Sequence, residues 1–267
     1  MSLFYIPFEF YHNMGSSKDI AYGDISYRSP KNLKPTRLRQ LLSIALAVTP
    51  LNNERHKRLD RGFLFVLEGI DGAGKTVVAD RVSQELESQG FDVIRLREPT
   101  NESQWGREIR RRSPEGELSP KEELELFIKD RRWHIKARIN PALLQKKVIL
   151  LDRYFYATGA YQSVSTGLSW QEILERNRVE ISAPEPDTVF ILDLPAEEGL
   201  CRITGRGCKT NKQFEQLERL IKVRQAYLEM SQEDEGNYYV VDATNPLTDV
   251  VSEVLSVIRK RLSGHVV

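Results

Sequence analysis

The sequence predicts an α/β fold in which helices cover both faces of a parallel β-sheet. From residue 63 onward, short apolar runs alternate with helical patterns. Strands that are buried on both faces of a parallel sheet are apolar along their whole length. A glycine-rich segment joins the first apolar run to the first helical pattern. Ligands of such sheets bind beyond the carboxyl ends of the strands, so we expect the functional residues there.

Local signals place each element in turn. Capping boxes begin helices at Ser119 and Ser169, and Gly90 follows the end of the first helix. The expected strands are residues 63–67, 93–96, 148–151, 189–192 and 238–241. The expected helices are residues 75–89, 120 to about 140, one after Ser169, one from Pro195, 214 to about 231, and about 247–262.

Composition limits the class of protein. The chain has 267 residues, enough for one large α/β domain with an appendage, and its formal net charge is only +1. That balance disfavours a nucleic-acid partner. No apolar run reaches the ~18 residues of a membrane span, and the start resembles no signal peptide. Two cysteines, Cys201 and Cys208, fit free thiols in a reducing compartment. We therefore expect a cytoplasmic protein with no membrane partner.

Residues 1–60 differ from the rest and form an expected N-terminal extension to a domain at 61–267. They carry 9 Lys and Arg against 5 Asp and Glu. Apolar residues recur at helical spacing after Thr36, and Pro50 ends that pattern. We expect a partly helical segment on the main domain or a mobile leader. A helix that binds a partner or a membrane surface is the alternative.

Residues 69–76 read GIDGAGKT, the pattern of a phosphate-binding loop, and they follow the first strand. Glycines let successive backbone N–H groups point at phosphate oxygens, while the next helix directs its positive end at them. Lys75 is expected to bridge the β- and γ-phosphates, and Thr76 to bind Mg²⁺. The predicted nucleotide contacts here are Gly69, Gly72, Ala73, Gly74, Lys75, Thr76 and Val77.

The third strand delivers a carboxylate, Asp152, to the same edge of the sheet, where it is a second candidate ligand for Mg²⁺. Arg153 follows at once, Arg97 ends the second strand, and Arg131 lies on the helix from residue 120. A single arginine is often no more than a solvated ion pair. Three that converge on one crevice indicate a second, anionic substrate beside the triphosphate.

At this point the chain from about residue 62 to 262 resembles the thymidylate kinases, which transfer the ATP γ-phosphoryl group to dTMP. The resemblance implies the P-loop nucleoside-monophosphate kinase fold with a short lid, here at about residues 204–212. The motifs occur in the family's order: E-G-I-D-G-A-G-K-T (68–76), R-E-P (97–99), F-I-K-D-R (127–131), D-R-Y (152–154), A-Y-Q (160–162), P-D-T-V-F-I-L-D (186–193), V-R-Q-A-Y-L (223–228) and V-D-A-T (241–244).

The resemblance implies a role for each matching residue. Asp71 would accept the 3′-hydroxyl of the sugar, and Arg97 and Arg153 would hold the acceptor phosphate. Phe127 would stack on thymine, Arg131 would bind the base, and Tyr161 would exclude a ribose 2′-hydroxyl. Without the family context, Phe127 and Tyr161 could equally be core residues. Thr158 and Gln162 complete the expected dTMP site; Arg202, Arg206, Asp242 and Ala243 complete the ATP site; Lys75, Arg153 and Arg206 are the expected catalytic residues.

Several positions depart from the family pattern. The R-E-P loop continues as T-N-E-S-Q-W-G, one residue longer than the family's, with Trp105 in place of a smaller residue. Thr158 stands where Ser is usual, and Ser163 where Gly often follows Y-Q. Gly72 stands where one subgroup carries a catalytic arginine, so we expect the lid to supply a cation. The candidates are Arg202, Arg206, Lys209 and Lys212.

We therefore predict an ATP:dTMP kinase that uses Mg²⁺. We also expect a homodimer, although the sequence by itself does not define the oligomeric state. Four alternatives remain. The first is a kinase that acts on another deoxynucleoside monophosphate, because the longer loop after R-E-P lies near the acceptor. A deoxynucleoside kinase would need no arginine pair for an acceptor phosphate. A GTPase would carry N-K-x-D, and the nearest match, residues 211–214, lacks the Asp. A non-catalytic nucleotide-binding module would not need Lys75, Thr76 and Asp152 together.

Overall fold

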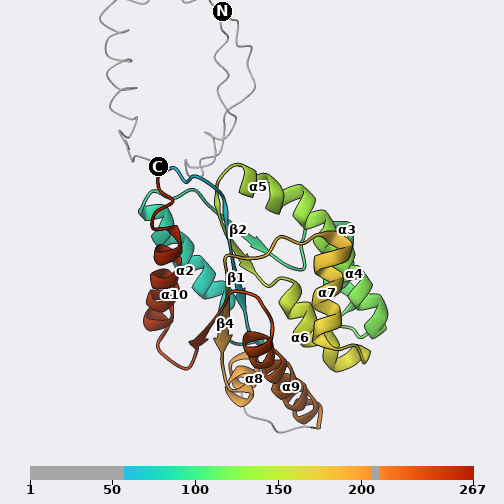
Figure 1. The fold of residues 1–267 in the computed structure, drawn as a ribbon. Helices are drawn as coiled ribbons and strands as arrows, with labels where there is room; N and C mark the ends of the chain where they lie inside the picture. Colours follow the sequence, from blue (N-terminus) through green and yellow to red (C-terminus); the bar gives the residue numbers. More distant parts are fainter. Residues whose placement is uncertain (1–56, 206–210) are drawn as a thin grey trace, which may run out of the picture. The chain divides into compact units, whose positions relative to one another are not determined.

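The computed structural model describes residues 57–205 and 211–267. Five strands form one parallel sheet, as predicted, and their order is β2-β3-β1-β4-β5 (Figure 1). Every residue of β1 is buried because helices cover both faces. The strands are β1 (Phe63–Glu68), β2 (Val93–Arg97), β3 (Val148–Asp152), β4 (Thr188–Asp193) and β5 (Tyr238–Asp242).

The helices form two layers. Helices α2 (Lys75–Ser88) and α10 (Leu247–Leu262) lie together on one face of the sheet (Figure 1). Most of the others cover the opposite face, where α6 packs against both α7 and α9. They are α3 (Gln104–Arg112), α4 (Pro120–His134), the π-helical turn η2 (Ile135–Ile139), α5 (Asn140–Leu144), α6 (Phe155–Thr166), α7 (Trp170–Ile181), α8 (Ala196–Thr204) and α9 (Asn211–Glu233).

The register of the sheet brings functional positions level with one another. Leu67 of β1 pairs with Asp152 of β3, and Asp152 in turn pairs with Arg97 of β2. All five strands run in the same direction, so their carboxyl ends form one edge. The loops that follow β1, β2 and β3 therefore meet there, as the sequence predicts.

Two helices, α3 and α6, are absent from the predicted elements, and one predicted helix is divided. Helix α3 is rich in arginine and lacks a clear apolar stripe. Helix α6 contains glycine, aromatic and β-branched residues of low helix propensity. Packing against α7 and α9 stabilises it instead. The predicted helix from 120 to about 140 is interrupted by η2 and then continues as α5.

The first described residues already contact the domain. Leu59 is buried and forms a β-bridge with Val266, and the Lys57 N–H donates to Gly90 O. The rest of the predicted extension, residues 1–56, lies outside the described residues, as do residues 206–210 of the predicted lid, including Cys208. Across the part of the chain that the structure describes, none of the helices has the length and apolarity to cross a membrane.

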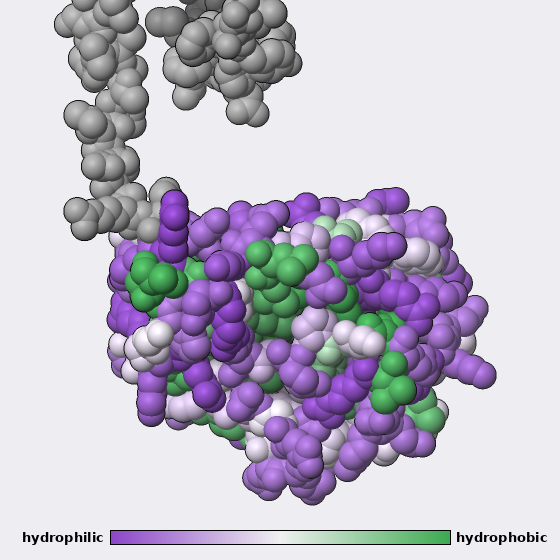
Figure 2. Space-filling view, turned by 45° about the horizontal axis from the view of Figure 1, so that its top comes forward, coloured by the Kyte–Doolittle hydropathy of each residue, from purple (hydrophilic) through white to green (hydrophobic). Residues whose placement is uncertain are grey.

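The surface of the described domain is mainly hydrophilic on the face shown in Figure 2, where hydrophobic residues gather in separate patches. Scattered apolar groups of this kind are normal on folded proteins.

Candidate active site

The loop after β1 has the backbone shape of a phosphate-binding loop. Gly72 has φ 86°, and a Cβ there would lie 2.5 Å from Gly199 O, so only glycine fits. Gly74 also has a positive φ and begins α2, and a Cβ there would meet no atom within 4 Å. The space above Gly74 is therefore open at the positive end of a 14-residue helix, which is where an anion binds favourably.

Lys75 is held inside this loop. Its Nζ donates to Gly69 O at 3.0 Å and to Ile70 O at 2.8 Å, and its side chain is buried. Burial lowers the pKa of Lys75, and the positive charge of Arg153 lowers it further. An incoming phosphate would place negative charge beside Lys75 and favour its charged ammonium form, which suits the predicted role of Lys75. Val77 lies exposed on α2.

Thr76 and Asp152 form a pair of oxygen donors beside the loop. Thr76 Oγ1 donates to Asp152 Oδ2 at 2.6 Å, and the buried Asp152 Oδ1 has no hydrogen-bond partner among the described residues. An unpaired buried carboxylate oxygen next to a hydroxyl fits Mg²⁺, which prefers oxygen ligands and keeps several from phosphates and water. The larger His, Cys, Asp and Glu clusters of an all-protein metal site are absent from the described residues.

Asp71, Arg153 and Tyr161 form a second group at the edge of the loop. The Arg153 guanidinium contacts the Asp71 carboxylate and lies 5.1 Å from the centre of the Tyr161 ring. The Tyr161 hydroxyl accepts a 3.0 Å hydrogen bond from the Asp71 N–H. Burial acts to raise the pKa of Asp71, but the charges of Arg153 and Lys75 outweigh it and lower the pKa. Asp71 is therefore a carboxylate acceptor, as its predicted role requires.

Glu68 lies beneath this group and holds three elements together. It is fully buried and accepts hydrogen bonds from the Tyr154 and Ala157 N–H groups and from the Tyr227 hydroxyl. Burial raises the pKa of Glu68. These bonds join the end of β1 to the start of α6 and to α9, and they flank Arg153, whose φ is 70°. Glu68 was not among the predicted site residues, although it begins the E-G-I-D-G motif.

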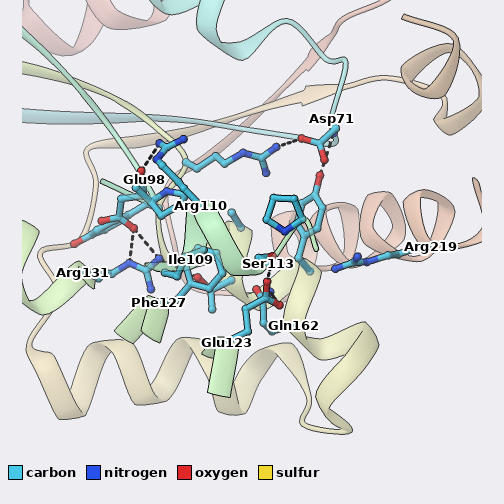
Figure 3. A pocket seen from close by; sticks show the side chains of 17 residues that line it. Asp71, Glu98, Ile109, Arg110, Ser113, Glu123, Phe127, Arg131, Gln162 and Arg219 are labelled. Carbon is cyan, nitrogen blue, oxygen red and sulfur yellow. Dashed lines mark hydrogen bonds and ion pairs between the residues drawn. The ribbon is translucent and has the colours of Figure 1, made fainter. Parts of the chain in front are cut away.

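A cavity of about 300 Å³ opens next to the loop and gathers most of the predicted acceptor residues (Figure 3). The predicted residues that line it are Asp71, Phe127, Arg131, Arg153, Thr158, Tyr161 and Gln162. Arg97 is not among the lining residues; its half-exposed side chain lies with Nε 3.8 Å from Asp152 Oδ2. Asp71 belongs both to the phosphate-binding loop and to this cavity, so the two sites adjoin.

Arg110 and Arg219 line the same cavity but were not predicted. Arg110 lies on α3, donates to Pro99 O, and has a buried Nε without a partner among the described residues. Arg219 lies on α9, with its guanidinium 5.8 Å from the centre of the Tyr161 ring. The run Arg110-Arg111-Arg112 is the one feature of the sequence that could have pointed to Arg110. Because α3 was not predicted, the sequence did not show that this run lies beside the acceptor cavity.

Arg131 is positioned by a buried network. Its Nε donates to Glu98 Oε2 at 2.8 Å, Nη1 to Asn177 Oδ1 at 2.7 Å, and Nη2 to Thr158 Oγ1 at 2.9 Å. His134 Nδ1 contacts the other Glu98 oxygen at 2.9 Å. Burial acts to raise the pKa of Glu98, but Arg131 and His134 outweigh it and lower the pKa. Arg131 Nη2 also lies 2.7 Å from Glu98 Oε2. A guanidinium has five N–H groups, so these contacts leave one N–H, on Nη1, for a ligand.

The long loop after R-E-P is attached to α4 by one carboxylate. Asp130 is buried and accepts hydrogen bonds from the Thr100 N–H at 2.8 Å, from the Thr100 hydroxyl at 2.6 Å, and from the Ser103 hydroxyl. Ser103 also caps α3 by accepting from the Gly106 N–H. The helix that carries Arg110 is thereby fixed against the helix that carries Phe127 and Arg131.

Arg202 connects the phosphate-binding loop to the end of β5. Its Nη1 donates to Gly72 O at 3.4 Å and its Nη2 to Ala243 O at 3.2 Å. Asp242 is exposed and accepts hydrogen bonds from Thr244. The predicted ATP contacts Arg202, Asp242 and Ala243 thus lie in one region. Arg206 and Lys209 lie outside the described residues, and the side chain of Lys212 is also not described.

Comparison with known proteins gives consistent matches. A family model described as "Thymidylate kinase" matches residues 67–254. The chain is 40% identical over 207 residues to a protein named "Thymidylate kinase" from Xanthomonas euvesicatoria pv. vesicatoria (strain 85-10), covering 76% of this chain and 88% of that protein. It is 42% identical over 200 residues to a "Probable thymidylate kinase" from Archaeoglobus fulgidus, covering 75% of this chain and 96% of that protein.

Proposed function

Because this chain belongs to the thymidylate kinase family, it is a nucleoside-monophosphate kinase that phosphorylates dTMP to dTDP, and we propose which of its residues carry out the transfer. One observation carries the proposal. Asp71 and Arg153 stand between the phosphate-binding loop and the cavity, and they contact each other directly. A phosphoryl group that leaves the loop toward the cavity passes this pair.

On the donor side, the loop amides and Lys75 bind the triphosphate and orient its γ-phosphoryl group. Phosphoryl transfer requires little covalent chemistry from the protein, so catalysis is positioning and charge stabilisation. Lys75 supplies a positive charge from inside the loop. Arg202 contacts Gly72 O and Ala243 O. Arg202, Asp242 and Ala243 form the part of the ATP site that binds the nucleoside.

We propose that Thr76 and Asp152 hold Mg²⁺ in the ATP complex, as their oxygen atoms and the unpaired Asp152 Oδ1 support. When bound, Mg²⁺ supplies charge neutralisation of the phosphate oxygens. Within the protein, Asp152 also fixes the Thr76 hydroxyl and lies near Arg97, so the same carboxylate organises both donor and acceptor sides.

On the acceptor side, the cavity supplies complementary groups for each part of dTMP. Phe127 offers a flat ring to the base, and Arg131 offers a guanidinium fixed by Glu98, Asn177 and Thr158. Asp71 accepts the sugar 3′-hydroxyl, and Tyr161 packs against the sugar. Arg97, Arg110 and Arg153 surround the position of the acceptor phosphate, which must lie in line with the donor.

We also propose that the enzyme acts in the cytoplasm as a homodimer. The free thiol of Cys201 suits a reducing compartment. Exposed apolar side chains such as Leu144 and Val179 are available to an interface.

A coupled assay tests the proposed function. Purified protein is offered ATP with Mg²⁺ and, in turn, dTMP, dUMP, dCMP, dGMP and thymidine. We expect the highest kcat/KM with dTMP, and no comparable rate with thymidine, because the arginines would lose their anionic partner. A higher kcat/KM with thymidine would establish the deoxynucleoside kinase alternative, and no turnover with any acceptor would refute a catalytic role.

A further inference from the structure

Glu123 contacts the side-chain amide of Gln162 at the wall of the acceptor cavity (Figure 3). Gln162 Nε2 donates to Glu123 Oε2 at 3.1 Å, which connects α6 to α4. The Ser113 hydroxyl contacts the other carboxylate oxygen of Glu123. Gln162 is only 3% exposed. The carboxylate is therefore held on one side by Ser113 and faces the amide on the other.

This contact determines which way round the amide lies. A glutamine amide has a donating NH₂ and an accepting carbonyl oxygen, and the two groups have nearly the same shape. A carboxylate accepts hydrogen bonds and donates none, so it selects the NH₂. The carbonyl oxygen must then lie on the opposite side of the amide. Among the described residues, no hydrogen bond occupies that side-chain oxygen, although Gln162 lines the cavity.

Arg131 and Gln162 thus give the cavity wall one donor and one acceptor, alongside other polar lining groups such as Thr158. Arg131 donates, and Gln162, so oriented, accepts. Thymine and uracil have a C4 carbonyl oxygen that accepts and an N3–H that donates, which complements this pair. Cytosine has a C4 amino group that donates and an N3 lone pair that accepts. Its amino group would face the Arg131 donor, and its N3 lone pair would face the Gln162 carbonyl oxygen.

We propose that Glu123 is a specificity-determining positioning residue, which orients Gln162 so that the enzyme accepts 4-oxo pyrimidines and rejects cytosine. The inference rests on the proposed function, because it requires a pyrimidine base against Phe127. Glu123 itself acts through Gln162. Buried polar groups that match one base strongly disfavour another that leaves them unpaired or opposed.

The test compares dTMP, dUMP and dCMP as acceptors for the wild type and Glu123→Gln. A glutamine at 123 can accept or donate, so it no longer selects one orientation of Gln162. We expect the kcat/KM ratio of dTMP to dCMP to fall by about tenfold or more, the scale of one hydrogen bond. The ratio of dTMP to dUMP should stay unchanged, because both bases present the same groups. A general structural defect would not separate the two ratios.

A matched control is Glu125→Gln, two residues along α4, where the carboxylate pairs with Arg176 instead of lining the cavity. It should leave both ratios unchanged. Ser113→Ala leaves the Glu123 carboxylate in place as an acceptor for Gln162 and should also leave both ratios unchanged.

The outcomes separate the inference from the function on which it rests. A wild-type protein that does not phosphorylate dTMP would refute the proposed function. A wild-type protein that does, together with an unchanged dTMP to dCMP ratio in Glu123→Gln, would overturn the inference alone. If Glu123→Gln does not fold, the ratio in Glu123→Ala, which removes the carboxylate altogether, decides: a fall supports the inference, and an unchanged ratio overturns it.

Discussion

The Thr76 hydroxyl donates a 2.6 Å hydrogen bond to Asp152, 76 residues later in the chain. This bond connects the first turn of α2 to the end of β3. In the sheet, Asp152 is also the register partner of Arg97 on β2. The two oxygen donors proposed for Mg²⁺ are thus already adjacent before any nucleotide binds. A preorganised pair of this kind costs little to complete when the ligand arrives.

Asp152→Asn should therefore raise the Mg²⁺ concentration needed for half-maximal turnover and lower kcat by roughly 10- to 100-fold, the range seen when groups that hold a metal are altered. The measurement is the initial rate against Mg²⁺ at fixed ATP. Asp193→Asn is the matched control, because Asp193 ends strand β4 of the same sheet and pairs with Arg224. An equal Mg²⁺ requirement in the two variants would contradict the metal assignment.

Lys75→Ala should lower the turnover rate by several orders of magnitude, because it removes the cation that the loop directs at the transferring phosphates. Its ammonium also contacts Gly69 O and Ile70 O, so the thermal midpoint is measured alongside the rate to separate loss of catalysis from unfolding. Retention of more than about a tenth of the rate, a change of only ~1.4 kcal/mol in the barrier, would remove Lys75 from the catalytic residues.

Arg97→Ala, Arg110→Ala and Arg153→Ala should each weaken use of dTMP far more than binding of ATP. Each removes a charge-assisted contact to the acceptor phosphate worth ~1.5–3 kcal/mol. Calorimetric titration of each variant with dTMP and with a non-hydrolysable ATP analogue separates the two sites. A variant that loses ATP affinity and keeps dTMP affinity assigns its arginine to the donor side.

Arg206 stays our predicted transition-state cation, in the lid beyond the described residues. Arg206→Ala should lower kcat by ~10²-fold or more with little change in the KM for dTMP, the scale of losing one electrostatic donor. Arg202→Ala should act differently and raise the KM for ATP, because Arg202 contacts Gly72 O and Ala243 O. Steady-state kinetics of alanine variants at 202, 206, 209 and 212 distinguish these roles. Near-normal kcat in all four would place the cation elsewhere.

Asp234→Asn should destabilise the fold in a pH-dependent way. Arg178 donates to both Asp234 oxygens at 2.7 Å, and Tyr238 donates to one of them. Burial acts to raise the pKa of Asp234, but these hydrogen bonds outweigh it and lower the pKa. A lowered carboxylate pKa stabilises the fold above the unfolded-state value of ~3.9, and that contribution disappears as pH falls through the folded-state pKa.

The free energy of unfolding of wild type and variant, measured by urea from pH 7 to pH 3, checks this expectation. The difference should be ~1–3 kcal/mol at pH 7 and should shrink toward the acid end. A difference that stays constant down to pH 3 would show that packing, rather than the carboxylate charge, stabilises this corner.

Local signals were enough to predict the strands, the phosphate-binding loop and most helices. The β1 run and the G-x-x-x-x-G-K-T spacing each depend on neighbours in sequence, so they can be read without a structure. Contacts between distant elements could not be predicted in this way. Asn177 falls at helical spacing on the buried face of α7, but its hydrogen-bond partner, Arg131, lies 46 residues earlier and could not be identified from the local sequence.

Arg110 was missed for the same reason. Its helix is only nine residues long, too short to be stable by itself, and depends on the Ser103 cap, which is itself held by Asp130 from another helix. Gln162 was predicted as a ligand residue, but the orientation of its amide depends on Glu123, 39 residues away. Helix α6 likewise forms through packing on α7 and α9 and not through its own sequence preference.

Because Asp130 holds both Thr100 and Ser103, the tip of the loop between them can change in sequence or length. Thr100 and Ser103 are fixed to Asp130, whereas Asn101 and Glu102 between them are exposed. Residues can therefore be inserted or exchanged at the tip of the loop without moving the helix that carries Arg110, since added loop length costs little free energy. Substitution of Thr100, Ser103 or Asp130, by contrast, would remove hydrogen bonds that hold both ends of the tip.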